Sequence, residues 1–285
     1  MKELTPYSIL CSAEPIVCYA HYSAYALSNP STTLVLSSIH DHPLRLTNAL
    51  AHDTIVASYP FVSPLTESYY KIYSLAFPDE GHHFLAGSDS IIGLFDLSRT
   101  GEGPVRSIHT VPSKRRKAVG GGVGMKGIIA SMDTSTDGIV AAGTFTRNIG
   151  LYDHQGADSC VAVFSLAGES GGAFDRSGGG VTQVLWSPCG RYLYVAERQS
   201  SCVLAYDIRV TGKLLVKLEG RNANTSQRLG IDTVHTAVGH EVWAGCLDGS
   251  VKVWSNAYES EESKPPDAEW MAHEGQDLCL NALGE

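Results

Sequence analysis

The sequence predicts an all-β fold assembled from repeated β-hairpins. The first observation is the run Glu241–Asn256, EVWAGCLDGSVKVWSN, in which Asp248-Gly249 separates two short apolar segments rich in Val and Trp. An Asp-Gly pair between such segments is a strong signal for a tight hairpin turn. The second is the content of 29 glycines, which suits many turns better than long helices. The third is that no window keeps apolar residues at helical spacing over a helical length.

Weaker copies of this hairpin lie upstream, at 32–48, 82–97, 138–154 and 191–208. Each copy ends in an aromatic-acidic pair or a degraded form of one, as Phe95-Asp96 does. The second members of the five pairs are separated by 49, 57, 54 and 48 residues. A hairpin recurring every ~40–45 residues or slightly more, and ending in Trp-Asp or a relative of it, is typical of a WD-repeat β-propeller.

We expect one propeller domain over residues 1–285, of the seven-bladed type and incomplete at its ends. The recognisable repeats are expected at about 16–48, 72–97, 127–154, 180–208 and 228–256. Residues 257–285 are expected to form an acidic loop and then the start of an unfinished blade, which Glu269–Gly275 would open. We interpret the incomplete ends as truncation, because an unclosed propeller exposes edge strands and half-buried faces. Closure by unusual means is the alternative.

Composition restricts the class of protein. A formal net charge of −9 argues against a surface uniformly basic for nucleic-acid phosphates, although a local basic face stays open. The seven cysteines are scattered and contain no CxxC pair, so we interpret them as reduced thiols of an intracellular protein. No apolar run approaches ~18 residues. The segment 15–27 lies too far inside the chain, and lacks the basic leader, for a signal peptide. The sequence therefore predicts a soluble, non-secreted protein.

Two catalytic motifs occur in unsuitable surroundings. The glycines at 122, 124 and 127 match a dinucleotide fingerprint, but a loop precedes them and a β-pattern follows where a helix is needed. The GxSxG match at 168–172 lies in a glycine-rich loop without the strand-to-helix turn of a nucleophile elbow. The histidines at 40, 42, 82 and 83 lie at turns and have no third ligand at metal-like spacing. We predict no enzyme activity, no cofactor and no metal site.

Two charged segments have ordinary and functional interpretations. Lys114-Arg115-Arg116-Lys117 is the most charge-dense segment; it would act as a nuclear localisation element or an RNA-phosphate contact, or be a solvated loop. The segment Tyr206–Arg209 resembles the WD-x-R box of propellers that act as receptors for cullin-4 ubiquitin ligases. An arginine is also common there as a solvated charge at the end of a strand.

Four segments carry a more specific resemblance: MKGIIASM at 125–132, RNIGLYDH at 147–154, GGGVTQVLWSPCGRYLYVAER at 178–198 and TSQRLGIDTVHTAVGHEVWAGCLDGSVKVW at 225–254. In order and spacing they resemble the telomerase Cajal-body protein family, WD-repeat proteins that bind small Cajal-body RNAs. Small fungal relatives in this group are linked to nuclear pre-mRNA splicing. The Gln-Arg pair ahead of a β-run is the most specific element, since ordinary WD repeats lack it.

The resemblance implies a scaffold that binds a short element of a small nuclear RNA and delivers the RNA-protein particle to a nuclear body. It implies residence in the nucleus, in the Cajal body or nucleoplasm, with the cytoplasm as the alternative. Proteins read RNA sequence mainly in single-stranded loops, with arginine forks and aromatic stacking. The matching positions suited to such contacts are Lys126, Arg147, Arg198, Gln227 and Arg228. The alternatives are a splicing accessory factor and a protein-only scaffold, such as a cullin-4 ligase receptor. We expect neither a membrane nor a small-molecule substrate as partner.

Overall fold

In a computed structural model of the chain, residues 9, 12–78, 81–112, 124–153, 156, 160–166, 178–260 and 262–273 are described, those at 52 and 53 by their backbone alone. These residues form five β-sheets and short 3-10 helices, so the all-β class predicted from the hairpins is confirmed. The chain divides into two compact units, residues 1–109 and 110–285, where the sequence suggested one continuous array.

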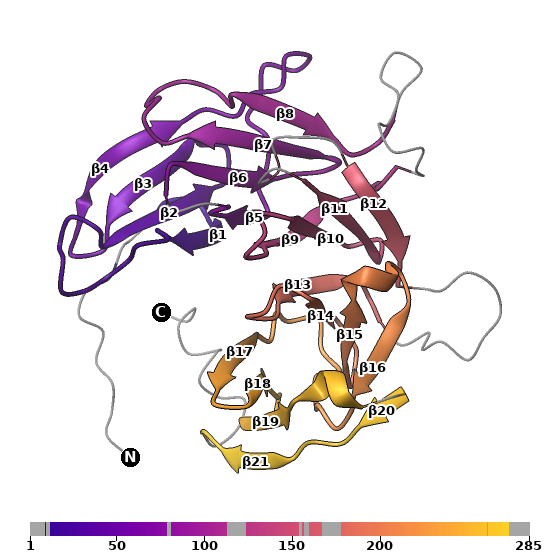
Figure 1. Cartoon of the computed structure of the whole chain (residues 1–285). Helices are drawn as coiled ribbons and strands as arrows, with labels where there is room; N and C mark the ends of the chain where they lie inside the picture. The colour runs from indigo at the N-terminus through magenta and orange to yellow at the C-terminus, as the bar shows by residue number, and fades with distance from the viewer. Residues whose placement is uncertain are drawn as a thin grey trace. The chain divides into compact units, whose positions relative to one another are not determined.

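Unit 1, residues 1–109, contains two four-stranded antiparallel sheets whose strands follow one another in chain order (Figure 1). The first sheet consists of β1 (Ile16–His21), β2 (Leu34–Ile39), β3 (Leu44–Asn48) and β4 (Ala51–Tyr59). The second consists of β5 (Ser74–Ala76), β6 (His83–Gly87), β7 (Ile91–Asp96) and β8 (Arg106–His109). Their shared core includes Phe84 and Phe95, whose rings stack with 4.8 Å between centroids.

Unit 2, residues 110–285, contains three sheets (Figure 1). The first consists of β9 (Ile129–Thr134), β10 (Val140–Thr144), β11 (Asn148–Tyr152) and β12 (Cys160–Ser165). The second consists of β13 (Val181–Trp186), β14 (Tyr192–Glu197), β15 (Val203–Asp207), β16 (Leu214–Leu218) and β20 (Glu262–Lys264), the last running parallel to β16. The third consists of β17 (Ile231–Thr236), β18 (Gly239–Gly245), β19 (Ser250–Ser255) and β21 (Ala268–Met271). The 3-10 helices η2 (Ile208–Val210) and η3 (Ala257–Glu259) connect strands.

The hairpin signalled by Asp248-Gly249 joins β18 to β19. Gly249 has φ +84°, a left-handed conformation that glycine adopts without the steric cost of a Cβ. The Asp248 carboxylate accepts hydrogen bonds from the backbone and the hydroxyl of Ser250, at 3.0 and 2.7 Å. These bonds close the turn through the side chain of an aspartate, which explains why Asp-Gly works at this place.

Of the segment 269–275, which the sequence suggested would open a further blade, the structure describes residues 269–273. Residues Ala268–Met271 form β21, which pairs antiparallel with β19 and completes the third sheet of unit 2. The physical reason is that β19 presents an edge to be paired, and the chain returns to it after residue 267. The carboxylate of Asp267 accepts from the backbone N–H of Ser255 at 2.7 Å, which fixes the start of this return.

Neighbouring sheets of unit 2 are joined by side chains that bond to backbone. The carboxylate of Asp133, on β9, accepts from the backbone N–H of Trp186, on β13, at 2.7 Å. The Gln183 amide donates to the carbonyl of Ile231 and accepts from its N–H, at 2.8 and 2.9 Å, so β13 is also tied to β17. Apolar residues fill the space between the sheets in two clusters, one of which includes the fully buried Trp254.

Candidate nucleic-acid interface

In each sheet of unit 2, the first strand begins where the second strand ends. The pairings that show this are Ile129 with Thr144, Val181 with Glu197, and Ile231 with Ala244. The residues that follow the second strand and those that precede the first therefore lie at the same end of each sheet. We call residues 145–147, 197–202 and 222–230 the turn cluster, because hydrogen bonds, an ion pair and a ring contact connect them in sequence.

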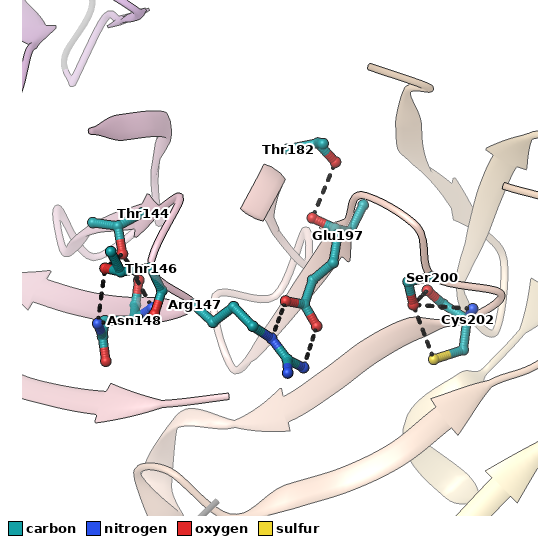
Figure 2. Close-up of polar contacts among 9 residues, drawn as sticks. Thr144, Thr146, Arg147, Asn148, Thr182, Glu197, Ser200 and Cys202 are labelled. Carbon is teal, nitrogen blue, oxygen red and sulfur yellow. Dashed lines mark hydrogen bonds and ion pairs between the residues drawn. The ribbon is translucent and has the colours of Figure 1, made fainter. Parts of the chain in front are cut away.

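An ion pair joins the first two parts of the turn cluster. The guanidinium of Arg147 donates from Nε to Glu197 Oε1 at 2.7 Å and from Nη2 to Oε2 at 2.9 Å (Figure 2). The side chain of Glu197 is 1% exposed and that of Arg147 is 15% exposed. A two-pronged pair of this kind fixes orientation as well as distance. It therefore holds the β10–β11 turn against the end of β14.

The β10–β11 turn is stiffened by its own polar side chains (Figure 2). The hydroxyl of Thr144 donates to the Asn148 carbonyl and accepts from the Asn148 N–H, both at 3.1 Å. The Asn148 amide donates to the carbonyl of Thr146, and the Thr146 hydroxyl donates to the carbonyl of Lys126 at 2.5 Å. The backbone of Lys126 is thus attached to this turn, and its side chain is exposed.

Arg198, directly after Glu197, lies over an aromatic ring. Its Cζ is 4.2 Å from the centroid of the Phe145 ring, within the range of a cation–π contact. Its Nε is buried and has no hydrogen-bond partner among the described residues. Burial, and after it the positive charge of Arg228, lowers the pKa of Arg198 below its usual value. An arginine so placed keeps its charge, and its unfilled donor favours an acceptor.

The third part of the cluster is attached to the second through its backbone. The N–H of Gln199 donates to the carbonyl of Thr225 at 2.9 Å, and the Thr225 hydroxyl accepts from the N–H of Gln227 at 3.2 Å. Arg221, 2% exposed, donates to the carbonyls of Leu229 and Gly245, at 2.7 and 3.2 Å. This buried cation holds the segment that carries Gln227 and Arg228, both of which are exposed.

The sequence-predicted residues thus have different surroundings. Lys126, Arg198, Gln227 and Arg228 lie at or beside the turn cluster, at the same ends of their sheets. Arg147 lies there too, but its guanidinium is engaged with Glu197. The basic segment 114–117 lies outside the described residues.

Sequence reasoning missed Phe145, Glu197 and Arg221. The signal for Phe145 was an aromatic residue at a hairpin turn, in the run TFTRN, where a polar residue is usual. Glu197 and Arg221 carried no local signal, because their contacts are distant in sequence. Glu197 pairs with Arg147, 50 residues away, and Arg221 donates to Gly245, 24 residues away.

Residues 62–96 match the WD40 family, described as WD domain, G-beta repeat. The chain is 30% identical over 250 residues to guanine nucleotide-binding protein negative regulator 1 of Schizosaccharomyces pombe, covering 86% of this chain and 58% of that protein. It is 27% identical over 284 residues to telomerase Cajal body protein 1 of Bos taurus, covering 99% of this chain and 47% of the relative. The chain is a WD40-repeat protein related to these two.

A third relative is Protein SWT21 of Eremothecium gossypii, 26% identical over 216 residues, covering 72% of this chain and 49% of the relative. The WD40 chain thus spans about half the length of the curated relatives it matches. The family resemblance drawn from the segments at 125–132, 147–154, 178–198 and 225–254 is confirmed at this level of identity.

The described residues contain neither a metal-binding group of His, Cys, Asp or Glu side chains nor a membrane-spanning helix. Within the described ranges, no three His, Cys, Asp or Glu side chains are grouped so that they would hold a metal ion. None of the helices in that part of the chain has the length and apolar character needed to cross a membrane. His40, a sequence-level metal candidate, lies 3.1 Å from the Asp41 carboxylate.

Proposed function

We propose that this WD40 chain is a non-catalytic scaffold that binds a small nuclear RNA, alone or as an RNA-protein particle, through the turn cluster of unit 2. The observation that carries the proposal is the placement of Arg198 on Phe145, close to the exposed Arg228. In a chain of net charge −9, two arginines close together at one end of adjacent sheets form a local cationic site. Local cationic sites with an aromatic support are typical of RNA-binding surfaces.

The relatives support the setting. One relative's name refers to telomerase and the Cajal body, which favours a nuclear small-RNA particle over other RNA classes. WD40 repeats are typically non-catalytic scaffolds, which agrees with a role in assembly. We therefore propose the nucleus, in the Cajal body or nucleoplasm, as its location, and ribonucleoprotein proteins as further partners. A splicing accessory role would use the same surface on a different small nuclear RNA.

The test is crosslinked immunoprecipitation of the tagged protein from its native locus, followed by sequencing of the bound RNA. The double variant Gln227→Ala/Arg228→Ala is the informative comparison, because both side chains are exposed and their loss should leave the fold intact. We expect wild type to enrich small nuclear RNAs and the variant to lose them. The recovered species would separate telomerase-type from splicing-type roles. A library equal to that of the untagged control would refute RNA binding.

A protein-only scaffold is the second candidate, and one observation favours it. Arg209 is 60% exposed on its side chain and donates from Nε and Nη2 to the Asp207 carboxylate, at 2.9 and 2.6 Å. This places an oriented cation at the far end of β15 from the turn cluster, where a ligase adaptor would dock. Arg209→Ala should then abolish co-purification of the adaptor, whereas an RNA scaffold should keep its RNA with this substitution.

A further inference from the structure

The contact with Phe145 decides which surface of Arg198 is available to a ligand. A guanidinium group has two flat faces and an edge that carries its N–H donors. Because Cζ of Arg198 lies 4.2 Å from the centroid of the Phe145 ring, the side of the guanidinium toward the ring cannot accept a stacked base. The opposite side and the N–H donors along the edge remain for a ligand.

One donor on that edge lacks an acceptor. The Nε of Arg198 is buried, and no described residue accepts its hydrogen bond. Leaving a donor of a charged group unsatisfied costs more than leaving a neutral one. The backbone around Arg198 is already used, since its N–H donates to Gly180 and its carbonyl accepts from Gly179, at 2.9 and 2.8 Å. Among the described residues no acceptor is available to this Nε, and an oxygen atom of a ligand at this edge would supply one.

A second cation is held near the first by backbone. Gln199, the neighbour of Arg198, donates its N–H to the carbonyl of Thr225, three residues before Arg228. The charge of Arg228 is close enough to lower the pKa of Arg198. Two positive charges close enough to affect one another's pKa repel each other. An anion between them would attract both and outweigh that repulsion.

We propose that Arg198 and Arg228 hold one phosphodiester group of a bound RNA strand between them, and so position the RNA by its backbone without reading its bases. This inference rests on the proposed RNA-binding function. Phosphate oxygens match the fork of N–H donors on a guanidinium edge. The fork also matches a base edge that presents two acceptors, as O6 and N7 of guanine do, and such a contact would differ from a phosphate contact in its dependence on sequence. Sequence selection would then fall to other groups, such as Gln227, which is exposed one residue before Arg228.

A phosphate contact has a signature that a base contact lacks. Its loss weakens every RNA by the same factor, and it lowers the slope of log affinity against log salt by about 0.7 for a single strand. A contact that reads a base changes the preference among sequences instead. For Arg198→Ala we expect a loss on the order of tenfold, since a hydrogen bond to a charged group is involved. Arg198→Lys keeps the charge without the fork and should fall between.

The experiment measures binding of the full chain to fluorescently labelled single-stranded RNAs made of uridine only, adenosine only and mixed sequence, over a range of salt concentrations. The matched control is Arg191→Ala, because Arg191 and Arg198 flank β14 at opposite ends and Arg191 is exposed. Thermal unfolding of each variant establishes that it is folded. Arg228→Ala, on an exposed side chain, serves as the second variant if Arg198→Ala is not folded.

We expect Arg198→Ala and Arg228→Ala to weaken all three RNAs equally and to lower the salt slope, while Arg191→Ala matches wild type. A changed preference among the RNAs with an unchanged salt slope would overturn the phosphate assignment and leave RNA binding standing. An equal loss with Arg191→Ala would also overturn it, because the effect would then be one of net charge. If wild type binds none of the three RNAs and does not bind the RNA species recovered by crosslinking, both proposals are overturned.

Discussion

Arg198 lies over the ring of Phe145, with its Cζ 4.2 Å from the ring centroid. The two residues come from different sheets of unit 2, Phe145 from the turn after β10 and Arg198 from the turn after β14. The Arg147–Glu197 ion pair lies beside this contact and joins the same two turns, since each member of the pair is within two residues of Phe145 or Arg198. The candidate site is thus an arrangement made by two hairpin turns, and neither turn contains it alone.

Replacing Phe145 with Leu should lower RNA affinity about two- to fivefold, because a cation–π contact at a partly exposed site contributes about 0.5–1 kcal/mol. The leucine keeps apolar bulk, so the free energy of unfolding should change less than in a cavity-forming substitution. The measurement is RNA binding alongside urea unfolding. Phe164→Leu is the control, since Phe164 is half-buried on β12 and packs on Tyr206 away from the turn cluster. Equal RNA affinity in both variants would contradict the role given to Phe145.

Replacing Arg147 with Met should lower the free energy of unfolding by about 3–5 kcal/mol, because Glu197 would be left buried and charged without its partner. The double variant Arg147→Met/Glu197→Gln should recover much of this loss, since no buried charge remains. Urea unfolding of wild type, both single variants and the double variant measures the coupling. An Arg147→Met protein as stable as wild type would show that the pair does not hold the two turns together.

The hairpins and the site were predictable to different extents. The Asp248-Gly249 turn is a local signal, and its strands β18 and β19 formed as expected. The place of β21 was not readable, because pairing with β19 depends on how the chain returns through residue 267. For Arg147, the motif located the residue but not its partner, since Glu197 is 50 positions away and pairs with it only after the sheets have packed.

The contribution of Asp133 to the free energy of unfolding should fall as pH rises from about 4 to 6. Burial raises the pKa of Asp133 from 3.8 to about 6, against the opposing effect of backbone hydrogen bonds from Trp186 and Thr134. The folded state therefore holds a proton that the unfolded state has released in this window. By linkage, the contribution to stability is full below pH 3.8 and is lost as pH rises through 6.

The measurement is the free energy of unfolding of wild type and Asp133→Asn at several pH values. The difference between them should change by on the order of 3 kcal/mol across the window, since each unit of pKa shift corresponds to about 1.4 kcal/mol. Comparing the two proteins removes the effect of other carboxylates. Parallel curves for the two proteins would contradict the raised pKa of Asp133.

Replacing Tyr194 with Phe should destabilise unit 2 and weaken its response to acid. The Tyr194 hydroxyl and His240 Nε2 are 2.7 Å apart, and both residues are buried. Burial, and after it the charge of His235, lowers the pKa of His240 below 6.5. When the neutral imidazole carries its proton on Nδ1, Nε2 accepts from the tyrosine hydroxyl, and protonation at Nε2 would remove that acceptor.

His240 therefore contributes stability that is present above pH 6.5 and is lost as pH falls through its lowered folded pKa. Tyr194→Phe removes the hydroxyl that shares a hydrogen bond with the buried Nε2, which should cost about 1–3 kcal/mol at neutral pH. It also removes a bond that favours the neutral ring, so the loss of stability on acidification should be smaller. Tyr258→Phe is the matched control, because its ring stacks on His240 with 5.1 Å between centroids while its hydroxyl bonds to Asn256. If both variants show the acid response of wild type, the hydrogen bond does not set the protonation of His240.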